Sequence, residues 1–466
     1  MNTPVIFTRK LIIDQLKKRV FTLPKCFEKD FQGLASQSQP KAFRYFATED
    51  QSIKGLVLFD TTKNPPIYIM DYRNDIKNIN QILLKDLSDQ GKLDIGPNAA
   101  YRVVNQGGDG LPLLIVDVFG DFIQIETLSE AWDGYISSMS EFLLKELGKK
   151  GTYWKRAWKG ISKHYMGQQF TYDDNGLSNL IIQENGIKYT IDLLDHQSTG
   201  FYLDHRETRK AVTDLFAKRE SGSILNLFSH TSTFSMVPST KGLKVSTYNV
   251  DHSKHNRDIA VKNFALNGIP HERFHRFIAK DVVLQLNQMK DTSNKFDVII
   301  LDPPHLVNSK EHGLLTTSNR YAELLRLALP FLNPGGFIFS FVDTAYVSLD
   351  SWYKQLNGVK GLPIGDSETI VTTEPSPTTM KKERRHKKEL LSSNIKEAKF
   401  SPTTLGNQSI GKMNQFKVLE FFKQPVDFRQ RPNDIAVNNQ LSGLLLKHKI
   451  DFHQTKFFTK NPEKKK

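Results

Sequence analysis

The sequence has 466 residues, of which 38% are hydrophobic and 24% are charged, with a formal net charge of +14. This length allows roughly three domains, and the composition excludes a chain that is disordered throughout. A membrane span is not expected, because the longest apolar runs, such as 111–116 and 335–342, have only the length of strands.

The positive charge is concentrated in three segments, residues 1–27, 375–400 and 447–466, and the rest of the chain is near neutral. Clusters of Lys and Arg release counterions from phosphate backbones, so the segments favour a polyanionic partner. Solvated tails are the alternative interpretation. The densest part of the middle segment holds the four cations that we single out as contacts to that partner, namely Lys381, Lys382, Arg384 and Arg385.

The N-terminal segment 1–27 spaces basic residues among Ile, Leu, Val and Phe, with Asp14 as its single acid. This pattern is typical of a mitochondrial targeting segment, and it predicts a protein of the mitochondrial matrix. An ordinary first helix or a basic arm of a cytoplasmic protein is the alternative. The single cysteine, Cys26, lies in this segment and excludes a disulfide framework and a cysteine-based zinc site. No bound metal is expected.

Residues 28–90 predict a small β domain, with strands at 55–60 and 67–70 that are separated by a turn rich in Lys, Asn and Pro. Residues 91–170 predict an α/β connector domain. It has two short strands within 101–127 and a helix over 132–147.

Residues 171–360 alternate short β-rich runs with helical stretches, which predicts a doubly wound, mostly parallel sheet. The expected strands are 224–228, 243–250, 274–279, 296–301 and 336–341, and the clearest helices are 253–266 and 320–329. Three further segments of different composition follow. Residues 361–412 are a basic insertion rich in Ser, Thr and Pro, 413–450 complete the sheet domain, and 451–466 form a basic tail.

In an open parallel sheet, ligands bind at the carboxyl ends of the strands, so the residues that follow each strand are the site candidates. Asn226 and Phe228 end the first strand, and Asp251 follows the second at a distance suited to a carboxylate that takes both ribose hydroxyls. Asp281 follows the third strand and is placed to receive an adenine amino group. Each acid alone is more often a helix cap, but the ordered set favours a nucleoside-bearing cofactor without phosphates.

The fourth strand ends in Asp302, Pro303, Pro304 and His305. Two prolines fix the backbone and remove two donors, so the carbonyls can accept from an exocyclic amine while His305 stacks on a base. A rigid turn is the alternative. These four residues are the catalytic candidates.

Several separated segments resemble the class I S-adenosylmethionine-dependent ribosomal RNA methyltransferases, specifically the large-subunit cytosine-5 type with an N-terminal PUA-like domain. The segments are 101–117, Glu184-Asn185-Gly186, Thr199–Arg206, Leu225–Ser229, Asn263–Gly268 and Phe296–Pro304. The resemblance implies a Rossmann-like methyltransferase domain, S-adenosylmethionine as cofactor, and RNA, most naturally ribosomal, as partner. It also makes a homodimer possible.

In that family, the residues that match Gly200–Arg206, among them Phe201, Asp204 and Arg206, surround the methyl donor. Those that match Phe228, Asp251, Asp281 and Asp302 do so as well. The sequence departs from the family at two places. Ser232 and Thr233 stand where relatives have glycines, and a side chain there costs on the order of 1 kcal/mol if the backbone is unchanged. The segment 339–342 lacks the cysteine that adds to C6 of cytosine in the family.

Two functional interpretations follow. In the first, the protein is an S-adenosylmethionine-dependent RNA methyltransferase that acts on a base nitrogen, which already carries a lone pair, rather than on cytosine C5. In the second, it is a catalytically inactive, methyltransferase-like protein that binds RNA or assists ribosome assembly. A nicotinamide-dependent oxidoreductase is a distant third, because no G-x-G-x-x-G sequence follows the first strand.

Overall fold

The computed structural model describes the chain in segments. They are residues 5–7, 22–23, 41–50, 52–60, 62–63, 67–71, 98–159, 163–165, 177–195, 198–219, 221–240, 242–309, 313–343, 347, 349–357, 416–422 and 441–448. The basic segments 375–400 and 451–466 and the residues Lys381, Lys382, Arg384 and Arg385 lie outside the described residues, as does most of 1–27.

The N-terminal part forms a small five-stranded sheet in the order β1-β3-β4-β5-β2. All of its pairings are antiparallel except that of β1 with β3. The strands are β1 (Val5–Phe7), β2 (Thr22–Leu23), β3 (Lys41–Thr48), β4 (Lys54–Asp60) and β5 (Ile67–Asp71). A small β domain is therefore present, and its likeness to a PUA domain remains a prediction.

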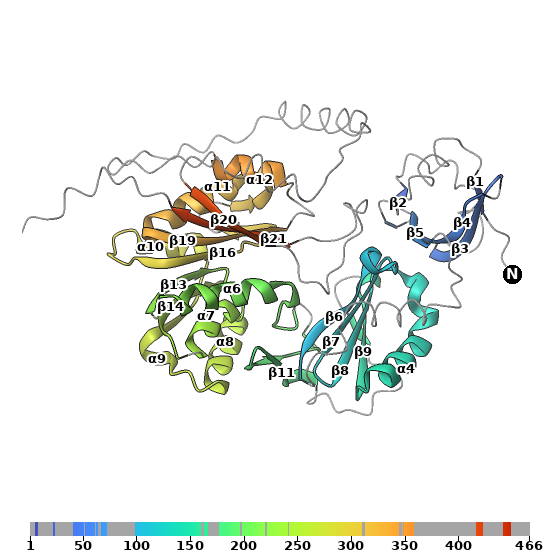
Figure 1. Ribbon diagram of the computed structural model, residues 1–466, viewed down its shortest axis with the longest axis horizontal. Coiled ribbons are helices and arrows are strands. Elements are labelled where there is room, and N and C mark those ends of the chain that lie inside the picture. The colour runs from blue at the N-terminus through green and yellow to red at the C-terminus, as the bar shows by residue number, and fades with distance from the viewer. Residues whose placement is uncertain are drawn as a thin grey trace, which may run out of the picture.

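The connector domain is a second five-stranded sheet, ordered β10-β9-β8-β7-β6 and accompanied by helix α4 (Figure 1). Its elements are β6 (Ala100–Asn105), η4 (Gln106–Asp109), β7 (Leu114–Phe119), β8 (Phe122–Thr127), η5 (Glu130–Tyr135), α4 (Ile136–Leu147), β9 (Gly151–Arg156), η6 (Ala157–Lys159) and β10 (Lys163–Tyr165). The helix expected over 132–147 thus begins as a 3-10 helix. Ser129, the N-cap of η5, accepts a hydrogen bond from the Ala131 N–H at 3.4 Å and donates to Asp60 Oδ2 at 2.6 Å. This second bond ties the two small domains together.

A β-hairpin of β11 (Leu180–Glu184) and β12 (Ile187–Ile191) precedes the main sheet. Its two-residue turn is Asn185-Gly186, and both residues have positive φ, +52° and +83°. Asn-Gly is the strongest sequence signal for such a turn, because both positions need a left-handed backbone. Ile182, Tyr189 and Phe201 share a buried cluster with Phe119 and Tyr153 of the connector domain. The hairpin therefore packs between the connector domain and the main sheet domain.

The main sheet has seven strands in the order β15-β14-β13-β16-β19-β21-β20, and the first five are mutually parallel. β21 is antiparallel to both of its neighbours. The strands are β13 (Ser221–Leu227), β14 (Lys244–Asp251), β15 (His275–Ala279), β16 (Phe296–Leu301), β19 (Leu332–Asp343), β20 (Phe416–Phe422) and β21 (Leu441–His448). The predicted strands are confirmed, with ends that shift by a few residues.

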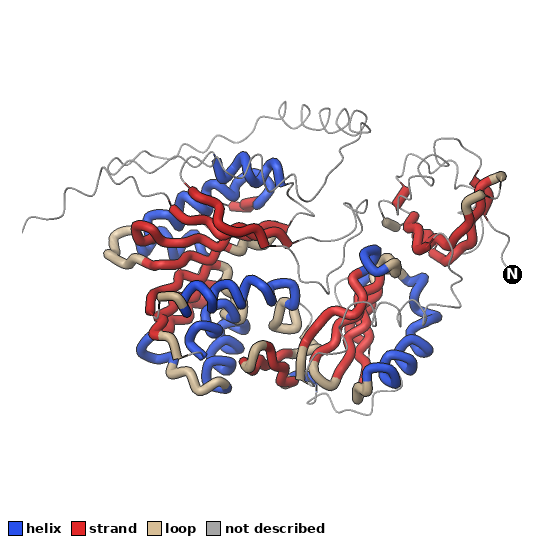
Figure 2. The backbone as a smooth tube through the Cα atoms, viewed as in Figure 1, coloured by secondary structure: helices blue, strands red, loops and turns tan. Residues whose placement is uncertain are grey.

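Helices cover both faces of this sheet (Figures 1 and 2). They are η7 (Leu203–His205), α6 (Arg206–Ala217), α7 (Thr233–Thr240), α8 (Lys254–Leu266), α9 (His271–Phe274), α10 (Val282–Met289), α11 (Thr317–Ala328), η8 (Leu329–Phe331) and α12 (Leu349–Asn357). A short hairpin of β17 (Leu306–Ser309) and β18 (Gly313–Thr316) follows β16. The Rossmann-like arrangement expected from the alternating sequence is thus the one observed.

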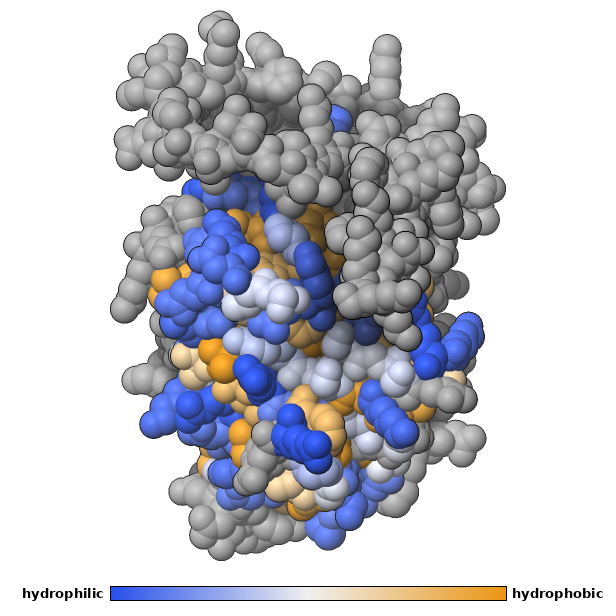
Figure 3. Space-filling view, turned by 90° about the vertical axis from the view of Figure 1, so that its left-hand side faces the viewer, coloured by the Kyte–Doolittle hydropathy of each residue, from blue (hydrophilic) through white to orange (hydrophobic). Residues whose placement is uncertain are grey.

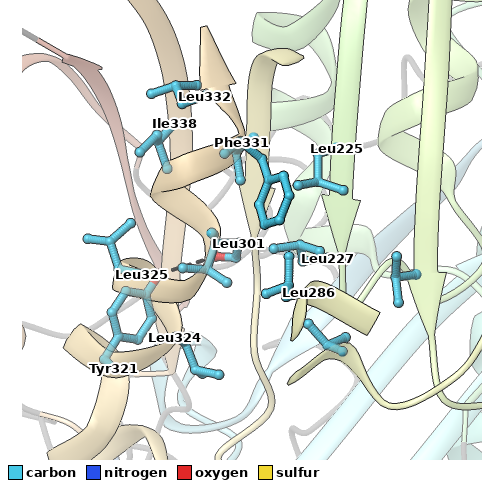
Figure 4. Close-up of a cluster of buried hydrophobic side chains, with 14 of the residues drawn as sticks. Leu225, Leu227, Leu286, Leu301, Tyr321, Leu324, Leu325, Phe331, Leu332 and Ile338 are labelled. Atoms are coloured by element: carbon cyan, nitrogen blue, oxygen red, sulfur yellow. Dashed lines mark hydrogen bonds between the residues drawn. The ribbon is translucent and has the colours of Figure 1, made fainter. Parts of the chain in front are cut away.

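Alternate residues of each central strand face opposite layers. Leu225, Leu227, Ile299 and Leu301 pack against α10, α11 and α12, whereas their neighbours Ile224, Val298 and Ile300 pack against α6 and α7. Figure 4 shows Leu324 and Leu325 of α11 in the first of these layers. Strands buried on both faces read as continuous apolar runs, which explains why the sequence identified them.

None of the helices in the described part of the chain is long and apolar enough to cross a bilayer. In the space-filling view, hydrophilic residues cover much of the described part of this face, and apolar residues gather in its upper middle and lie singly elsewhere (Figure 3).

Candidate active site

A cavity of about 860 Å³ lies at the carboxyl ends of the central strands. Its described lining includes six Asp and five His but neither Lys nor Arg. The lining residues are Asp192, Asp195, Ser198, Tyr202, Asp204, His205, Phe228, Ser229, His230, Thr233, Phe234, Asp251, His252, Ser253, His255, Asn256, Asp302, Pro303, Pro304, His305 and Asp343. Such a lining suits a cationic ligand with several hydrogen-bond donors.

Asp251, the last residue of β14, is fixed by its surroundings. Its Oδ2 accepts from the His230 N–H at 2.9 Å, and its Oδ1 accepts from the Ser253 N–H at 2.9 Å and from Asn256 Nδ2 at 3.3 Å. These donors fix the orientation of the carboxylate. Oδ2 keeps a lone pair for a ligand, since each carboxylate oxygen can accept two hydrogen bonds.

The loop between β13 and α7 is built from non-glycine residues in the left-handed region. Phe228, His230 and Ser232 have φ values of +58°, +49° and +60°. Ser232 therefore carries backbone strain, whereas Thr233, the second residue that the resemblance matches to glycine, begins α7. Non-glycine residues in this region cost on the order of 1 kcal/mol each. The chain adopts the glycine-type conformation without the glycines.

His230 lies in this loop beside the cavity. Burial lowers the pKa of its imidazole to about 4, although the nearby carboxylates of Asp251, Asp302 and Asp195 act in the opposite direction. The ring lies 4.8 Å from that of Tyr202, centroid to centroid. His230 is therefore neutral near pH 7 and presents a flat, uncharged surface next to the carboxylates.

His205 and Asp302 form a close pair on the cavity wall. His205 Nε2 lies 3.0 Å from Asp302 Oδ2, and the His205 side chain is 5% exposed. Phe234 and Phe341 hold the imidazole edge-on, with centroid distances of 4.9 and 5.0 Å. The predicted Asp302 thus has a partner that the sequence did not identify, although His205 stands within the Thr199–Arg206 segment.

A buried ion pair between Arg209 and Glu184 supports the segment Gly200–Arg206. Arg209 donates to both oxygens of Glu184 at 2.6 and 2.9 Å and to the Tyr202 carbonyl at 2.8 Å. Burial opposes the charge of Arg209, but the Glu184 carboxylate outweighs it and raises the pKa of the guanidinium. Arg206 donates to the Ala100 carbonyl at 2.9 Å. Arg206 therefore connects this segment to the connector domain.

The structure brings together seven of the residues singled out from sequence. Asp204, Phe228, Asp251, Asp302, Pro303, Pro304 and His305 all line the cavity.

The other five described candidates lie outside the lining. Gly200 accepts a hydrogen bond from Thr231 Oγ1 at 2.7 Å, and Phe201 lies under the Arg209 guanidinium at 4.2 Å. Arg206 makes the contacts given above. The remaining two are Asn226, whose Nδ2 donates to Ser235 Oγ at 3.0 Å, and Asp281, whose Oδ1 caps α10 by accepting from the Leu284 N–H at 2.8 Å.

The end of β19 differs from the expected catalytic segment of the cytosine-5 type. Ser340 is fully buried and pairs with the Tyr321 hydroxyl at 2.7 Å, and Phe341 contacts His205. Asp343, at the last position of the strand, lines the cavity. The strand thus presents a carboxylate to the same cavity as Asp302.

Comparison with known proteins agrees with this geometry. Residues 171–356 match the family model described as S-adenosylmethionine-dependent methyltransferase. Ribosomal RNA large subunit methyltransferase I of Aeromonas salmonicida is 31% identical over 244 residues, which cover 52% of this chain and 60% of that protein. Its counterpart in Shewanella denitrificans is 30% identical over 258 residues, 54% of this chain and 63% of that protein. The match thus spans less than two thirds of the length of these curated relatives.

Two solved structures share the fold. "A putative methyltransferase complexed with SAH" superposes with a TM-score of 0.72 at 20% identity over 96% of this chain and 100% of that chain. A second, from Streptococcus mutans and described as "a putative sam-dependent methyltransferase", gives 0.70 at 18% identity over 95% of this chain and 100% of that chain. Residues 171–356 are thus similar in sequence to S-adenosylmethionine-dependent methyltransferases, and the chain shares the fold of these two structures.

Proposed function

We propose that the protein is an S-adenosylmethionine-dependent RNA methyltransferase that acts on a base nitrogen. The observation that carries the proposal is that Asp251, at the end of β14, and Asp302–His305, at the end of β16, line one cavity. One part of the cavity then has the carboxylate suited to a ribose, and the other has the turn suited to an amine.

The cofactor fits the residues present. Asp251 keeps a free lone pair for a ribose hydroxyl, and the acidic lining complements a cationic sulfonium. The neutral His230 and the ring of Tyr202 supply flat surfaces for a nucleoside. S-adenosylmethionine, when bound, supplies an activated methyl group on its sulfonium sulfur.

The chain's own groups favour a nitrogen as the acceptor of that methyl group. A base nitrogen already has the lone pair that forms the new C–N bond, whereas cytosine C5 needs a thiolate to add to C6 first. The only cysteine in the sequence is Cys26, far from the strand ends in sequence. Asp302 accepts hydrogen bonds from the amino group before transfer and takes up the proton that the methylated nitrogen releases.

Ribosomal RNA is the substrate that we propose, because the curated relatives are large-subunit rRNA methyltransferases. The basic segments outside the described residues fit a polyanionic substrate. We further propose that residues 1–27 direct the protein to mitochondria. A reporter fusion that lacks these residues should then stay in the cytosol, and continued import would contradict the assignment.

The test uses full-length protein, radiolabelled S-adenosylmethionine and rRNA from cells in which the gene is deleted. Calorimetry first measures donor binding, and then methyl incorporation and nucleoside mass spectrometry identify the product. Incorporation into an N-methylated nucleoside supports the proposal. A folded protein that binds RNA but incorporates nothing would instead support the non-catalytic role, which the strained loop of Phe228, His230 and Ser232 also fits.

A further inference from the structure

We propose that His205 is a positioning residue that fixes Asp302 as a hydrogen-bond acceptor, so that the site selects a base with an exocyclic amino group. The inference rests on the proposed function and adds the substrate class and the residue that sets it. It begins from the 3.0 Å contact between His205 Nε2 and Asp302 Oδ2.

The environment of the imidazole determines where its proton lies. His205 Nδ1 is buried and has no hydrogen-bond partner among the residues that the structure describes. An imidazolium would leave an N–H donor there without an acceptor, which costs more than an unused lone pair on a neutral ring. Nδ1 is therefore the bare nitrogen, and the single N–H of the ring is on Nε2.

The proton on Nε2 in turn makes Asp302 a hydrogen-bond acceptor. Because Nε2 donates, Asp302 Oδ2 has to accept, and the carboxyl group acts there as an acceptor. The Asp302 side chain is 26% exposed and lines the cavity, so its other oxygen is accessible to a ligand. An accessible acceptor needs a donor from the substrate.

The neighbouring groups strengthen this preference. Asp343 and Asp204 add carboxylates to the same cavity, and Pro303 and Pro304 have no N–H to donate. The amino groups of adenine, cytosine or guanine satisfy such acceptors, whereas a carbonyl edge such as O4 of uracil would face them without a donor. The aromatic pair Phe234 and Phe341 keeps the His205 ring from rotating away.

Two substitutions separate positioning from packing. His205→Phe keeps a ring between Phe234 and Phe341 but removes the N–H, so the turnover number should fall at least about tenfold, with the KM for S-adenosylmethionine unchanged. His205→Gln retains an amide N–H donor for Asp302 and should keep most of the turnover. His275→Gln is the matched control, since His275 is a buried histidine that pairs with Thr247 Oγ1 at 3.0 Å and does not line the cavity.

The assay uses rRNA from the deletion cells with radiolabelled S-adenosylmethionine, and mass spectrometry identifies the methylated nucleoside. A methyl group on an exocyclic amine, with the Gln variant active and the Phe variant impaired, supports the inference. A methylated uridine or a C-methylated cytidine overturns the substrate class. Equal turnover in the Phe, Gln and control variants overturns the role of His205.

A spectroscopic measurement on the protein alone keeps the two proposals distinguishable. Long-range ¹H–¹⁵N NMR of the histidine rings should show His205 as the Nε2–H tautomer, and Asp302→Ala should change its signals while those of His275 stay. A Nδ1–H tautomer or an imidazolium overturns the positioning role whatever the activity. A protein that has the expected tautomer and binds the donor but methylates no RNA overturns the proposed function and, with it, the substrate class.

Discussion

Asn267 hydrogen-bonds to both backbone polar groups of Lys188: its Oδ1 accepts from the N–H at 2.9 Å and its Nδ2 donates to the carbonyl at 2.7 Å. One helical turn earlier, Asn263 Oδ1 accepts from the Thr190 N–H at 2.8 Å. β12 pairs with β11 on one side, and the side-chain amides of Asn263 in α8 and of Asn267, the C-cap of α8, occupy its other edge. The Asn263–Gly268 segment thus acts as a substitute for a neighbouring strand.

We expect Asn267→Asp to lower the free energy of unfolding by about 1 kcal/mol, because the carboxylate keeps an acceptor but loses the donor to the Lys188 carbonyl. Asn263→Ala should cost about 2 kcal/mol, since the Thr190 N–H then has no partner. Urea unfolding measures both. Unchanged stability in the two variants would show that the edge of β12 does not depend on α8.

Ser232→Gly should stabilise the protein by about 1 kcal/mol, because Ser232 has a φ of +60° and glycine adopts this region without steric cost. Thr233→Gly is the matched control. It should destabilise, since Thr233 belongs to α7 and glycine loses more backbone entropy in a helix. Thermal unfolding of the two variants should therefore shift in opposite directions, and a shift in the same direction would contradict the strain at Ser232.

His230 should make stability depend on pH. Its pKa in the folded protein is about 4, below the ordinary 6.5, so between these values the unfolded state binds the additional proton. The stability that the neutral, buried His230 allows is fully present above about pH 6.5, and it falls by on the order of 3 kcal/mol as the pH drops toward 4. His230→Asn tolerates the left-handed backbone without titrating. As the pH falls from 6.5 to 4, the unfolding free energy of the wild type should decrease relative to that of this variant. A difference that does not change with pH would contradict the lowered pKa of His230.

Asp281 has two candidate roles that a single substitution separates. Asp281→Ser keeps a good N-cap for α10, so stability should stay within a few tenths of a kcal/mol of wild type. Affinity for S-adenosylmethionine should fall by about tenfold if the carboxylate also receives the adenine amino group. Asp281→Ala, which removes the cap as well, should in addition lose about 1 kcal/mol of stability. Unchanged affinity in calorimetry would leave Asp281 with the cap alone.

Reversal of charge at Lys381, Lys382, Arg384 and Arg385 should lower RNA affinity and flatten its dependence on salt, because fewer counterions are released. Filter binding of rRNA fragments at several salt concentrations measures both. The same affinity and the same salt slope would identify these side chains as a solvated segment.

The central strands could be predicted because each is an apolar run buried on both faces, as Phe296–Leu301 illustrates. Asp251 and the Asp302–His305 turn could be placed in one site because parallel strands end at the same edge of a sheet. The pairing of His205 with Asp302 could not, since it joins residues far apart in the chain and depends on how η7 packs over β16. Patterns of hydrophobicity and of secondary-structure propensity do not tell which residues far apart in the chain come into contact. The hydrogen bond from Ser129, the N-cap of η5, to Asp60 could not be predicted for a related reason, because it joins residues of two domains.

The position of β21 has a consequence for the synthesis of the protein. β21 follows β20 in the chain, yet it lies between β19 and β20, and Asp343 is opposite Leu441. During synthesis the β19 edge, which ends at Asp343, therefore stays uncovered until β21 has emerged, about 100 residues later. Closing so long a loop is entropically slow. During that time the exposed edge of β19 is a place where a chaperone can bind or where two nascent chains can pair.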